Sequence, residues 1–235
     1  MYGKPNGKFL NQTLINPKAI VFDWDDTLVD NWHSIHAGLN AALTAMGHDP
    51  WPIDKTRSNV RRSMRDSFPS LFGEKWKEAA EIFLSHVRRN HLETIYVLDY
   101  VPEMLSHFHQ AGIYLGVVSN KNGVLLREEV EFLNWNKWIS KTVGANDAVR
   151  DKPDKAPIDL VLDGSGISRS KEVWFVGDAI SDMECAYNAG VSAILLRANA
   201  YDPKEFAEFP PDRTFKNASE LTRFFILPKQ SGQNR

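Results

Sequence analysis

The stretch AIVFDWDDTL, residues 19–28, decides how the rest of the chain is interpreted. Residues 19–22 form an apolar run, which predicts a strand buried on both faces of a sheet. Carboxylates follow at residues 23, 25 and 26. Like charges at the end of a buried strand repel one another unless a cation lies among them. We therefore expect Asp23 and Asp25 to form a site for a hard metal ion.

Composition places the chain among ordinary globular proteins. It has 235 residues, of which 43% are hydrophobic and 25% charged, enough for one large core with room for an inserted module. The formal net charge of −2 argues against a surface for nucleic acid. The single cysteine, Cys185, excludes an intrachain disulfide and suits a reducing cytosol. Because no apolar run approaches the roughly 18 residues of a spanning helix, we expect a cytoplasmic protein without membrane contact.

The chain divides into an α/β core and an inserted helical segment. We expect an N-terminal extension over residues 1–17, a core formed by 18–30 and 98–227, a helical interval over 31–97, and a tail over 228–235. Inside the interval, the spacing of apolar residues predicts helices at about 31–46, Thr56–Asp66 and Glu74–Glu93, with no convincing strand.

From Pro102 onward, helices and strands alternate, which favours a parallel sheet covered by helices on both faces. Apolar runs predict strands at Ile113–Val118, Lys141–Gly144, Val173–Val176, Ala193–Leu196 and, as an edge, Arg213–Phe215. The predicted helices are Met104–Ala111, Val124–Leu133, Ile158–Leu162, Met183–Ala189 and Ser219–Phe225.

Polar residues interrupt these strands at their carboxyl ends, which is where ligands bind in open α/β sheets. One strand ends in Ser119-Asn120, another ends in Gly177-Asp178 with Asp182 four residues on, and Lys152 lies in a loop between them.

Together with Asp23, Asp25 and Thr27, this set resembles the haloacid dehalogenase (HAD) superfamily, in particular its phosphatases of the phosphoglycolate-phosphatase type. The motifs occur in the family's order over residues 19–200: Asp23-Trp-Asp25-Asp-Thr27, then Ser119, then Lys152, then Gly177-Asp178-Ala-Ile-Ser-Asp182. The resemblance implies a Rossmann-like parallel sheet with helices on both faces, and the helical interval matches the family's first type of cap. Asp26 departs from the pattern, because these phosphatases commonly have glycine there.

The chemistry of a phosphate ester explains the acidic residues. Its negative charge repels an incoming anion, so the site must first neutralise that charge, and Mg²⁺ with oxygen ligands does so. Asp23 can give one oxygen to the metal and attack phosphorus with the other, forming an aspartyl-phosphate. Asp178 supplies a further carboxylate to Mg²⁺, and Asp182, one helical turn later, lies in or just behind the metal shell.

The resemblance adds a role for Asp25: its backbone carbonyl binds the metal, while its side chain protonates the leaving group and then deprotonates the attacking water. We expect Ser119, Asn120, Lys152 and Thr27 to bind the phosphoryl group. Lys121 competes with Lys152 for that role, and Lys152 is preferred because Lys152-Pro153 with Ala156-Pro157 looks like the family's third motif.

Simpler interpretations remain beside these. Aspartates after strands are often helix caps or turn formers, and Thr27 is also suited to cap the following helix. Arg57, Arg61 and Arg65 recur at successive helical turns, where they form either a solvated basic face or a patch for an anionic substrate. We expect the helical cap to close over the core by hinging near Asp30 and near residues 98–101.

The sequence therefore predicts a Mg²⁺-dependent phosphatase acting on a small phosphorylated metabolite, as a monomer or weak homodimer. A phosphomutase of the same superfamily would use the same core, although Thr27 favours the phosphatase. A phosphoacceptor signalling module also combines acidic residues, a hydroxyl, a lysine and Mg²⁺, but it is normally about half this length. A dehalogenase has no use for carboxylates arranged around a divalent cation. The physiological substrate and the pathway are not specified.

Overall fold

The computed structural model describes residues 14–60, 62–199 and 201–226. Its main sheet has six strands in the order β5-β4-β1-β6-β7-β8, and every neighbouring pair is parallel. The strands are β1 (Ala19–Phe22), β4 (Tyr114–Asn122), β5 (Lys141–Ala145), β6 (Val173–Gly177), β7 (Ser192–Leu196) and β8 (Arg213–Phe215). The predicted parallel α/β core is confirmed.

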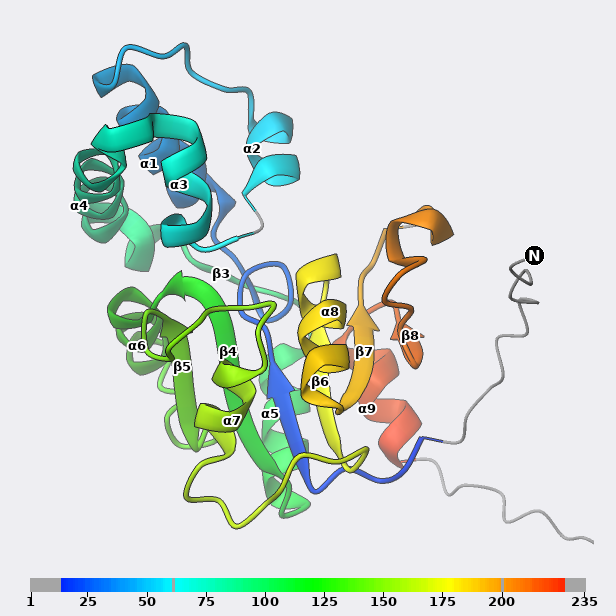
Figure 1. The fold of residues 1–235 in the computed structure, drawn as a ribbon. Helices are drawn as coiled ribbons and strands as arrows, with labels where there is room; N and C mark the ends of the chain where they lie inside the picture. The colour runs from blue at the N-terminus through cyan, green and yellow to red at the C-terminus, as the bar shows by residue number, and fades with distance from the viewer. Residues whose placement is uncertain (1–13, 61, 200, 227–235) are drawn as a thin grey trace, which may run out of the picture.

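Helices cover both faces of this sheet (Figure 1). Residues of α5 (Val101–Gln110), α6 (Gly123–Phe132) and α9 (Ala218–Ile226) share one apolar cluster, and those of α7 (Ala156–Leu162) and α8 (Ile180–Ala189) share another. A short 3₁₀ helix, η2 (Pro203–Phe206), precedes β8.

Strand β1 explains why the deciding stretch is apolar without alternation. Its Ile20 and Phe22 pack into the first cluster, while Ala19 and Val21 pack into the second. All four are fully buried, because β1 pairs with β4 on one side and with β6 on the other. A central strand with both faces covered therefore needs apolar residues at every position.

The inserted segment is a bundle of helices, hereafter the helical module. It consists of α1 (Trp32–Ala45), α2 (Ile53–Asn59), α3 (Met64–Phe72), the 3₁₀ turn η1 (Gly73–Lys75) and α4 (Trp76–Thr94). The module has its own apolar cluster, which includes Leu39, Leu43, Phe68 and Phe72. Figure 1 shows it above the edge of the sheet at which the strands end.

Two short strands join the module to the core, and the prediction that residues 31–97 contain no strand is wrong. β2 (Val29–Asp30) pairs with β3 (Tyr96–Val97) in antiparallel fashion. Each strand has two residues, which is too short for an alternating pattern to appear in the sequence.

The single helix predicted over Thr56–Asp66 is also wrong, because the structure has two helices there. Helix α2 ends at Asn59, and Ser63 is extended, with φ −62° and ψ 159°, before α3 begins. The Ser63 hydroxyl donates to Oδ2 of Asp66 at 3.1 Å. Serine at this position favours the start of a new helix.

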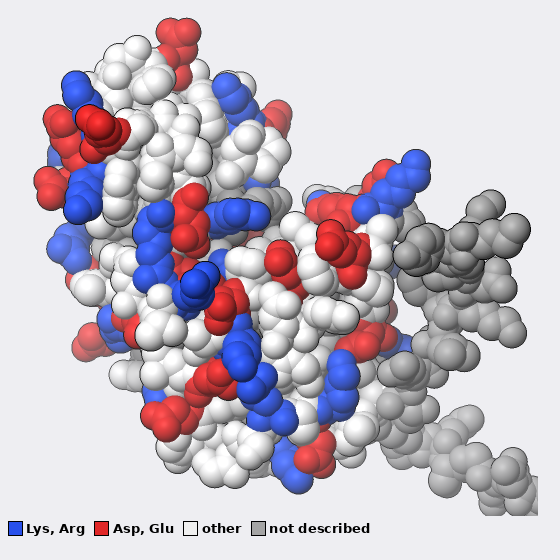
Figure 2. Space-filling view, viewed as in Figure 1, with Lys and Arg blue, Asp and Glu red and all other residues white. Residues whose placement is uncertain are grey.

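The predicted termini fall largely outside the described residues: 1–13 of the N-terminal extension and the whole tail over 228–235. Within the described part, Leu14 is buried, and the carbonyl of Ile15 accepts a hydrogen bond from Trp174 Nε1 at 3.1 Å. Among the described helices, none has the length and apolar character needed to cross a bilayer. Figure 2 shows acidic and basic side chains interspersed on one face of the molecule.

Candidate active site

A cavity of about 110 Å³ lies between the sheet and the helical module. The core contributes polar residues to its lining: Asp23, Asp25, Ser119, Asn120, Lys121, Lys152, Asp178, Ser181 and Asp182. The module contributes mostly apolar ones: Trp32, Ile35, Val60, Arg62, Met64, Phe83 and Val87. The carboxyl ends of β1, β4 and β6 therefore face one cavity, as the strand-end pattern predicts.

Asp23 is held at the end of β1 by the sheet itself. Its backbone N–H donates to the carbonyl of Val176 at 2.8 Å, which continues the pairing of β1 with β6. Its side chain is buried, and Lys152 Nζ donates to Oδ1 at 2.5 Å. Burial raises the pKa of Asp23 to about 7; the charge of Lys152 opposes this shift and that of Asp182 adds to it.

Asp178 and Asp182 bring two further carboxylates to Asp23. One oxygen from each of the three residues lies within 4.8 Å of the others, and all three side chains are buried. Lys152 Nζ also donates to Asp182 Oδ1 at 2.7 Å, and the backbone N–H of Ala179 donates to Asp182 Oδ2 at 3.0 Å. Three buried carboxylate oxygens this close together fit a divalent cation with oxygen ligands.

Because Gly177 has no side chain, the carboxylate of Asp182 can lie directly against its backbone. A Cβ atom at position 177 would lie closer to Cγ of Asp182 than real contacts between such atoms allow. Any other residue at the end of β6 would therefore displace this carboxylate from the cluster.

Asp25 lies beside the cluster and has its own cation. Lys121 Nζ donates to Asp25 Oδ1 at 3.0 Å. Burial raises the pKa of Asp25 to about 6, while Lys121 lowers it and the charge of Glu129 raises it. A carboxyl group with a pKa in this range can both donate and accept a proton near neutral pH.

Asp26 shows how the turn after β1 tolerates a residue other than glycine. Its φ is 63°, in the left-handed region that glycine adopts without strain and that aspartate tolerates better than most residues. Its Oδ2 accepts a hydrogen bond from Trp32 Nε1 at 2.6 Å. Asp26 therefore fastens the turn to the start of α1.

The two lysines reach the cavity at different places. Lys152 contacts Asp23 and Asp182, whereas Lys121 contacts Asp25 and Glu129. Asn120 Nδ2 donates to the carbonyl of Lys152 at 3.3 Å, which ties the end of β4 to that loop. The geometry thus gives Lys152, and not Lys121, the position next to Asp23.

Ser119 lies in the last part of β4, which continues beyond the predicted end of that strand. The pairing of β4 with β5 shifts in register between Val118 and Asn122, so Ser119 falls in an irregular part of the strand. Its hydroxyl accepts from the backbone N–H of Lys121 at 3.2 Å.

Thr27 does not reach the cavity. Its side chain is buried, does not belong to the cavity lining, and has no hydrogen-bond partner for Oγ1 among the described residues. Its backbone N–H donates to the carbonyl of Trp24 at 3.3 Å, so Thr27 forms part of the turn after β1. The structure therefore does not bring Thr27 into the cavity lining, and its role in binding the phosphoryl group stays a prediction.

Of the three arginines at successive helical turns, the two that the structure describes, Arg57 and Arg65, do not line the cavity. Arg57 lies 3.5 Å from Asp30 and over the ring of Trp32, and Arg65 Nε pairs with the buried Asp151 at 2.6 Å. Arg61 lies outside the described residues. The module arginine in the lining is Arg62, which the sequence pattern did not single out.

Glu129 is the second residue that sequence analysis missed. It is fully buried in α6, where Lys121 Nζ donates to both of its oxygens, at 2.9 and 2.8 Å. Burial acts to raise its pKa, but the charge of Lys121 and hydrogen bonds from His91, Lys121 and Trp24 hold the pKa below its ordinary value. A signal existed, because Glu129 shares the apolar face of the helix with Leu125, Leu126 and Val130.

Comparisons with known proteins agree with this geometry. The family model for haloacid dehalogenase-like hydrolases matches residues 20–196. The chain belongs to this family. A phosphoglycolate phosphatase from Psychrobacter arcticus is 25% identical over 224 residues, which span 90% of this chain and 97% of the relative.

Two further proteins are similar to this chain. An N-acetylmuramic acid 6-phosphate phosphatase from Pseudomonas aeruginosa is 27% identical over 193 residues, spanning 80% of this chain and 85% of the relative. The solved structure of a haloacid dehalogenase-like hydrolase from Bacteroides fragilis has a TM-score of 0.80 at 21% identity, and covers 88% of this chain and all of its own. The resemblance seen in the sequence motifs is confirmed, and the protein is a HAD-like hydrolase.

Proposed function

We propose that this HAD-like hydrolase is a Mg²⁺-dependent phosphatase that cleaves a small phosphate monoester through an aspartyl-phosphate on Asp23. One observation carries the proposal: a buried carboxylate at the end of β1 lies 2.5 Å from an ammonium group and within 4.8 Å of two further carboxylates. The names of the similar phosphatases support the same reaction class.

The residues present fit Mg²⁺. Asp23 and Asp178 would hold the ion with carboxylate oxygens, the carbonyl of Asp25 would add a third ligand, and Asp182 would bind or orient it. When bound, the ion neutralises charge on the phosphoryl oxygens. The carboxylate oxygens of Asp23, Asp178 and Asp182 lie close enough together to repel one another when ionised, and a bound cation would relieve that repulsion.

The chain's own residues account for the proton and phosphoryl transfers. Asp23 attacks phosphorus, the bond from phosphorus to the leaving oxygen breaks, and protonated Asp25 gives its proton to that oxygen. Asp25 then takes a proton from water, the water oxygen bonds to phosphorus, and the bond to Asp23 breaks. Inorganic phosphate leaves, and Asp25 is protonated again. Ser119, Asn120 and Lys152 orient the phosphoryl group through these steps.

The helical module supplies the contacts to the leaving group. The cavity of about 110 Å³ is smaller than the several hundred Å³ of typical ligand pockets, which favours a small substrate. Six module residues in the lining are apolar and one, Arg62, is cationic. We propose that residues 31–97 act as a cap that hinges near Asp30 and Leu98, and that Arg62 selects a leaving group with its own negative charge.

A phosphate-release screen tests this function. Phosphoglycolate, sugar phosphates, nucleotides and phospholipid head groups are offered with and without Mg²⁺. We expect release of phosphate from at least one small ester when Mg²⁺ is present and no bisphosphate activator is added. If release required a bisphosphate activator, that result would favour a mutase. Asp23→Asn should abolish release, while the matched control Asp26→Asn, on the same turn but outside the carboxylate cluster, should retain it. Activity surviving in Asp23→Asn would refute the proposal.

A further inference from the structure

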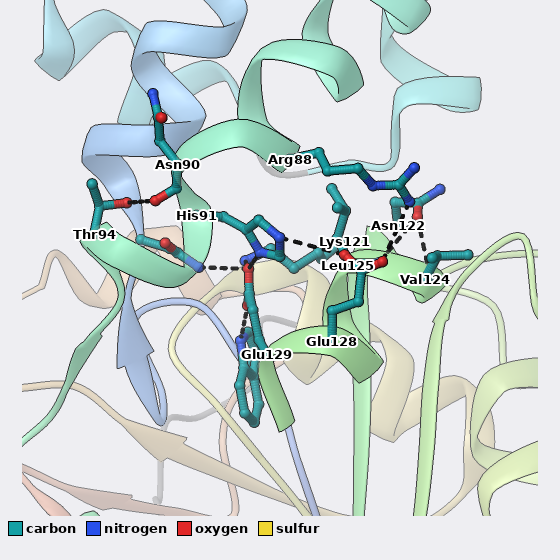
Figure 3. A network of polar contacts seen from close by, with 12 residues as sticks. Arg88, Asn90, His91, Thr94, Lys121, Asn122, Val124, Leu125, Glu128 and Glu129 are labelled. Atoms are coloured by element: carbon teal, nitrogen blue, oxygen red, sulfur yellow. Dashed lines mark hydrogen bonds and ion pairs between the residues drawn. The ribbon is translucent and has the colours of Figure 1, made fainter. Parts of the chain in front are cut away.

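Glu129 joins four segments of the chain at one buried carboxylate. Trp24 Nε1 donates to it at 2.6 Å from the turn after β1, and Asn31 Nδ2 at 2.8 Å from the residue before α1. His91 Nδ1 donates at 2.8 Å from α4, and Lys121 donates from β4. Figure 3 shows His91 and Lys121 directed toward Glu129, which lies on α6. We call these five residues the Glu129 cluster.

Lys121 links this cluster to Asp25. An ammonium group has three N–H donors. The contacts of Lys121 Nζ are the two oxygens of Glu129, at 2.9 and 2.8 Å, and Oδ1 of Asp25, at 3.0 Å. All three donors are therefore directed to carboxylate oxygens, and the position of the Lys121 ammonium is fixed by Glu129.

The contact with Lys121 makes the two side-chain oxygens of Asp25 different from each other. Oδ1 accepts from Lys121, whereas Oδ2 accepts no hydrogen bond from the described residues. A proton on Oδ1 would face the Lys121 ammonium, so the proton belongs on Oδ2.

We propose, resting on the proposed phosphatase function, that Glu129 is a positioning residue for leaving-group protonation: it holds Lys121 on Oδ1 of Asp25 and leaves Oδ2 to deliver the proton. In the phosphorylation step, the Oδ2–H bond breaks as the proton moves to the leaving oxygen, and Asp25 remains as a carboxylate. Glu129 exchanges no proton.

The test compares leaving groups that differ in their need for a proton. The alkyl ester is phosphoglycolate, or the alkyl ester that the screen shows to be cleaved fastest. The aryl ester is p-nitrophenyl phosphate, whose leaving group departs without a proton. Because kcat/KM reports phosphorylation alone in a ping-pong reaction, it is the quantity measured. We expect Glu129→Gln to lower kcat/KM roughly 10²-fold for the alkyl ester and less than about threefold for the aryl ester. Asp25→Asn should show the same selective pattern.

Glu128→Gln is the matched control. Glu128 is the neighbouring residue of α6 and contacts Arg88 at 3.6 Å and His91 Nε2 at 3.4 Å, but it does not contact Lys121. We expect both esters to be cleaved at the wild-type rate. A Glu129→Gln variant with equal losses on the two esters, or with none, would overturn the inference while leaving the phosphatase function intact. A wild type that releases no phosphate would overturn the function, and the inference with it.

A second set of variants covers the case in which Glu129→Gln does not fold. Lys121→Met combined with Glu129→Gln removes the buried pair together and leaves no unpaired charge from it. If Glu129 acts through Lys121, this double variant loses no more alkyl-ester activity than Lys121→Met alone. A double variant that loses more alkyl-ester activity than Lys121→Met alone would contradict the inference.

Discussion

At the scale of single residues, the site depends on carboxyl groups whose burial disfavours the ionised form. Burial raises the pKa of Asp23 from 3.8 to about 7 and that of Asp25 from 3.8 to about 6. Burial disfavours the bare carboxylate in both residues. A bound cation would therefore stabilise Asp23, and a proton would stabilise Asp25. Cys185, by contrast, is a buried thiol whose burial raises its pKa, which agrees with a structural role.

These shifts predict how stability depends on pH in the metal-free protein. Between the unfolded value of 3.8 and about 7, the folded chain holds a proton on Asp23 that the unfolded chain has released. The contribution of Asp23 to stability is therefore complete below pH 3.8 and is lost as pH rises through about 7.

Asp23→Asn removes this dependence, because asparagine does not titrate. Relative to the wild type, its free energy of unfolding in EDTA should rise by on the order of 3 kcal/mol between about pH 5 and about pH 8, since one pKa unit corresponds to about 1.4 kcal/mol. Urea denaturation at each pH measures the difference. Curves that stay parallel would show that Asp23 titrates normally in the folded protein.

At the scale of elements, the sequence predicts what local pattern determines. The apolar run of β1 and the polar residues at strand ends are enough to predict Asp23, Ser119 and Asp178 at one edge of the sheet. The strands β2 and β3 leave no such signal, because two residues carry no period. The break between α2 and α3 leaves a single-residue signal, Ser63, a residue type that favours the start of a helix.

Contacts between distant elements could not be predicted in the same way. Glu129 lies 105 residues from Trp24 and 98 from Asn31 along the chain. A pattern within one helix can mark Glu129 as a charged residue on a buried face, but it does not identify the partners. The same holds for Arg65, whose periodic spacing fits either a solvated face or a substrate patch but does not identify its partner, Asp151.

The lining of the cavity gives a prediction about the helical module. Arg62→Ala should raise KM for esters whose leaving group carries a carboxylate, with kcat/KM about tenfold lower or more, because a hydrogen bond to a charged group contributes roughly 1.5–3 kcal/mol. p-Nitrophenyl phosphate, which lacks that charge, should be cleaved as before. Arg57→Ala is the control, since Arg57 does not line the cavity. Equal effects on both esters would exclude Arg62 as the specificity residue.

At the scale of the whole molecule, the module and the core meet at the active site through buried polar contacts. Arg65 of α3 pairs with Asp151, which precedes Lys152, and His91 of α4 donates to Glu129. Each side of the cavity thus depends on contacts to the other side. The carboxylates and lysines come from the core, and the module adds its apolar residues to the same cavity because it lies against the sheet edge.

Metal binding should therefore be visible in the stability of the whole chain. A ligand that binds only the folded state raises its stability by about 2.7 kcal/mol at a concentration 100 times Kd. We expect Mg²⁺ to raise the Tm of the wild type, and to raise it more at about pH 8 than at about pH 5.5, because the ion needs ionised carboxylates. Asp178→Asn should lose most of the rise, whereas Asp159→Asn, on the surface helix α7, should keep it. An equal rise in the two variants would place the ion elsewhere.

The central claim is that Asp23 forms a covalent bond to phosphorus, and chemical trapping tests it most directly. Turnover is quenched in acid, the protein is reduced with borohydride, and its peptides are identified by mass spectrometry. An aspartyl-phosphate is reduced to homoserine, so we expect homoserine at position 23 in the presence of Mg²⁺ and substrate, and not without substrate. Active enzyme with unmodified Asp23, or with homoserine at another aspartate instead, would contradict it.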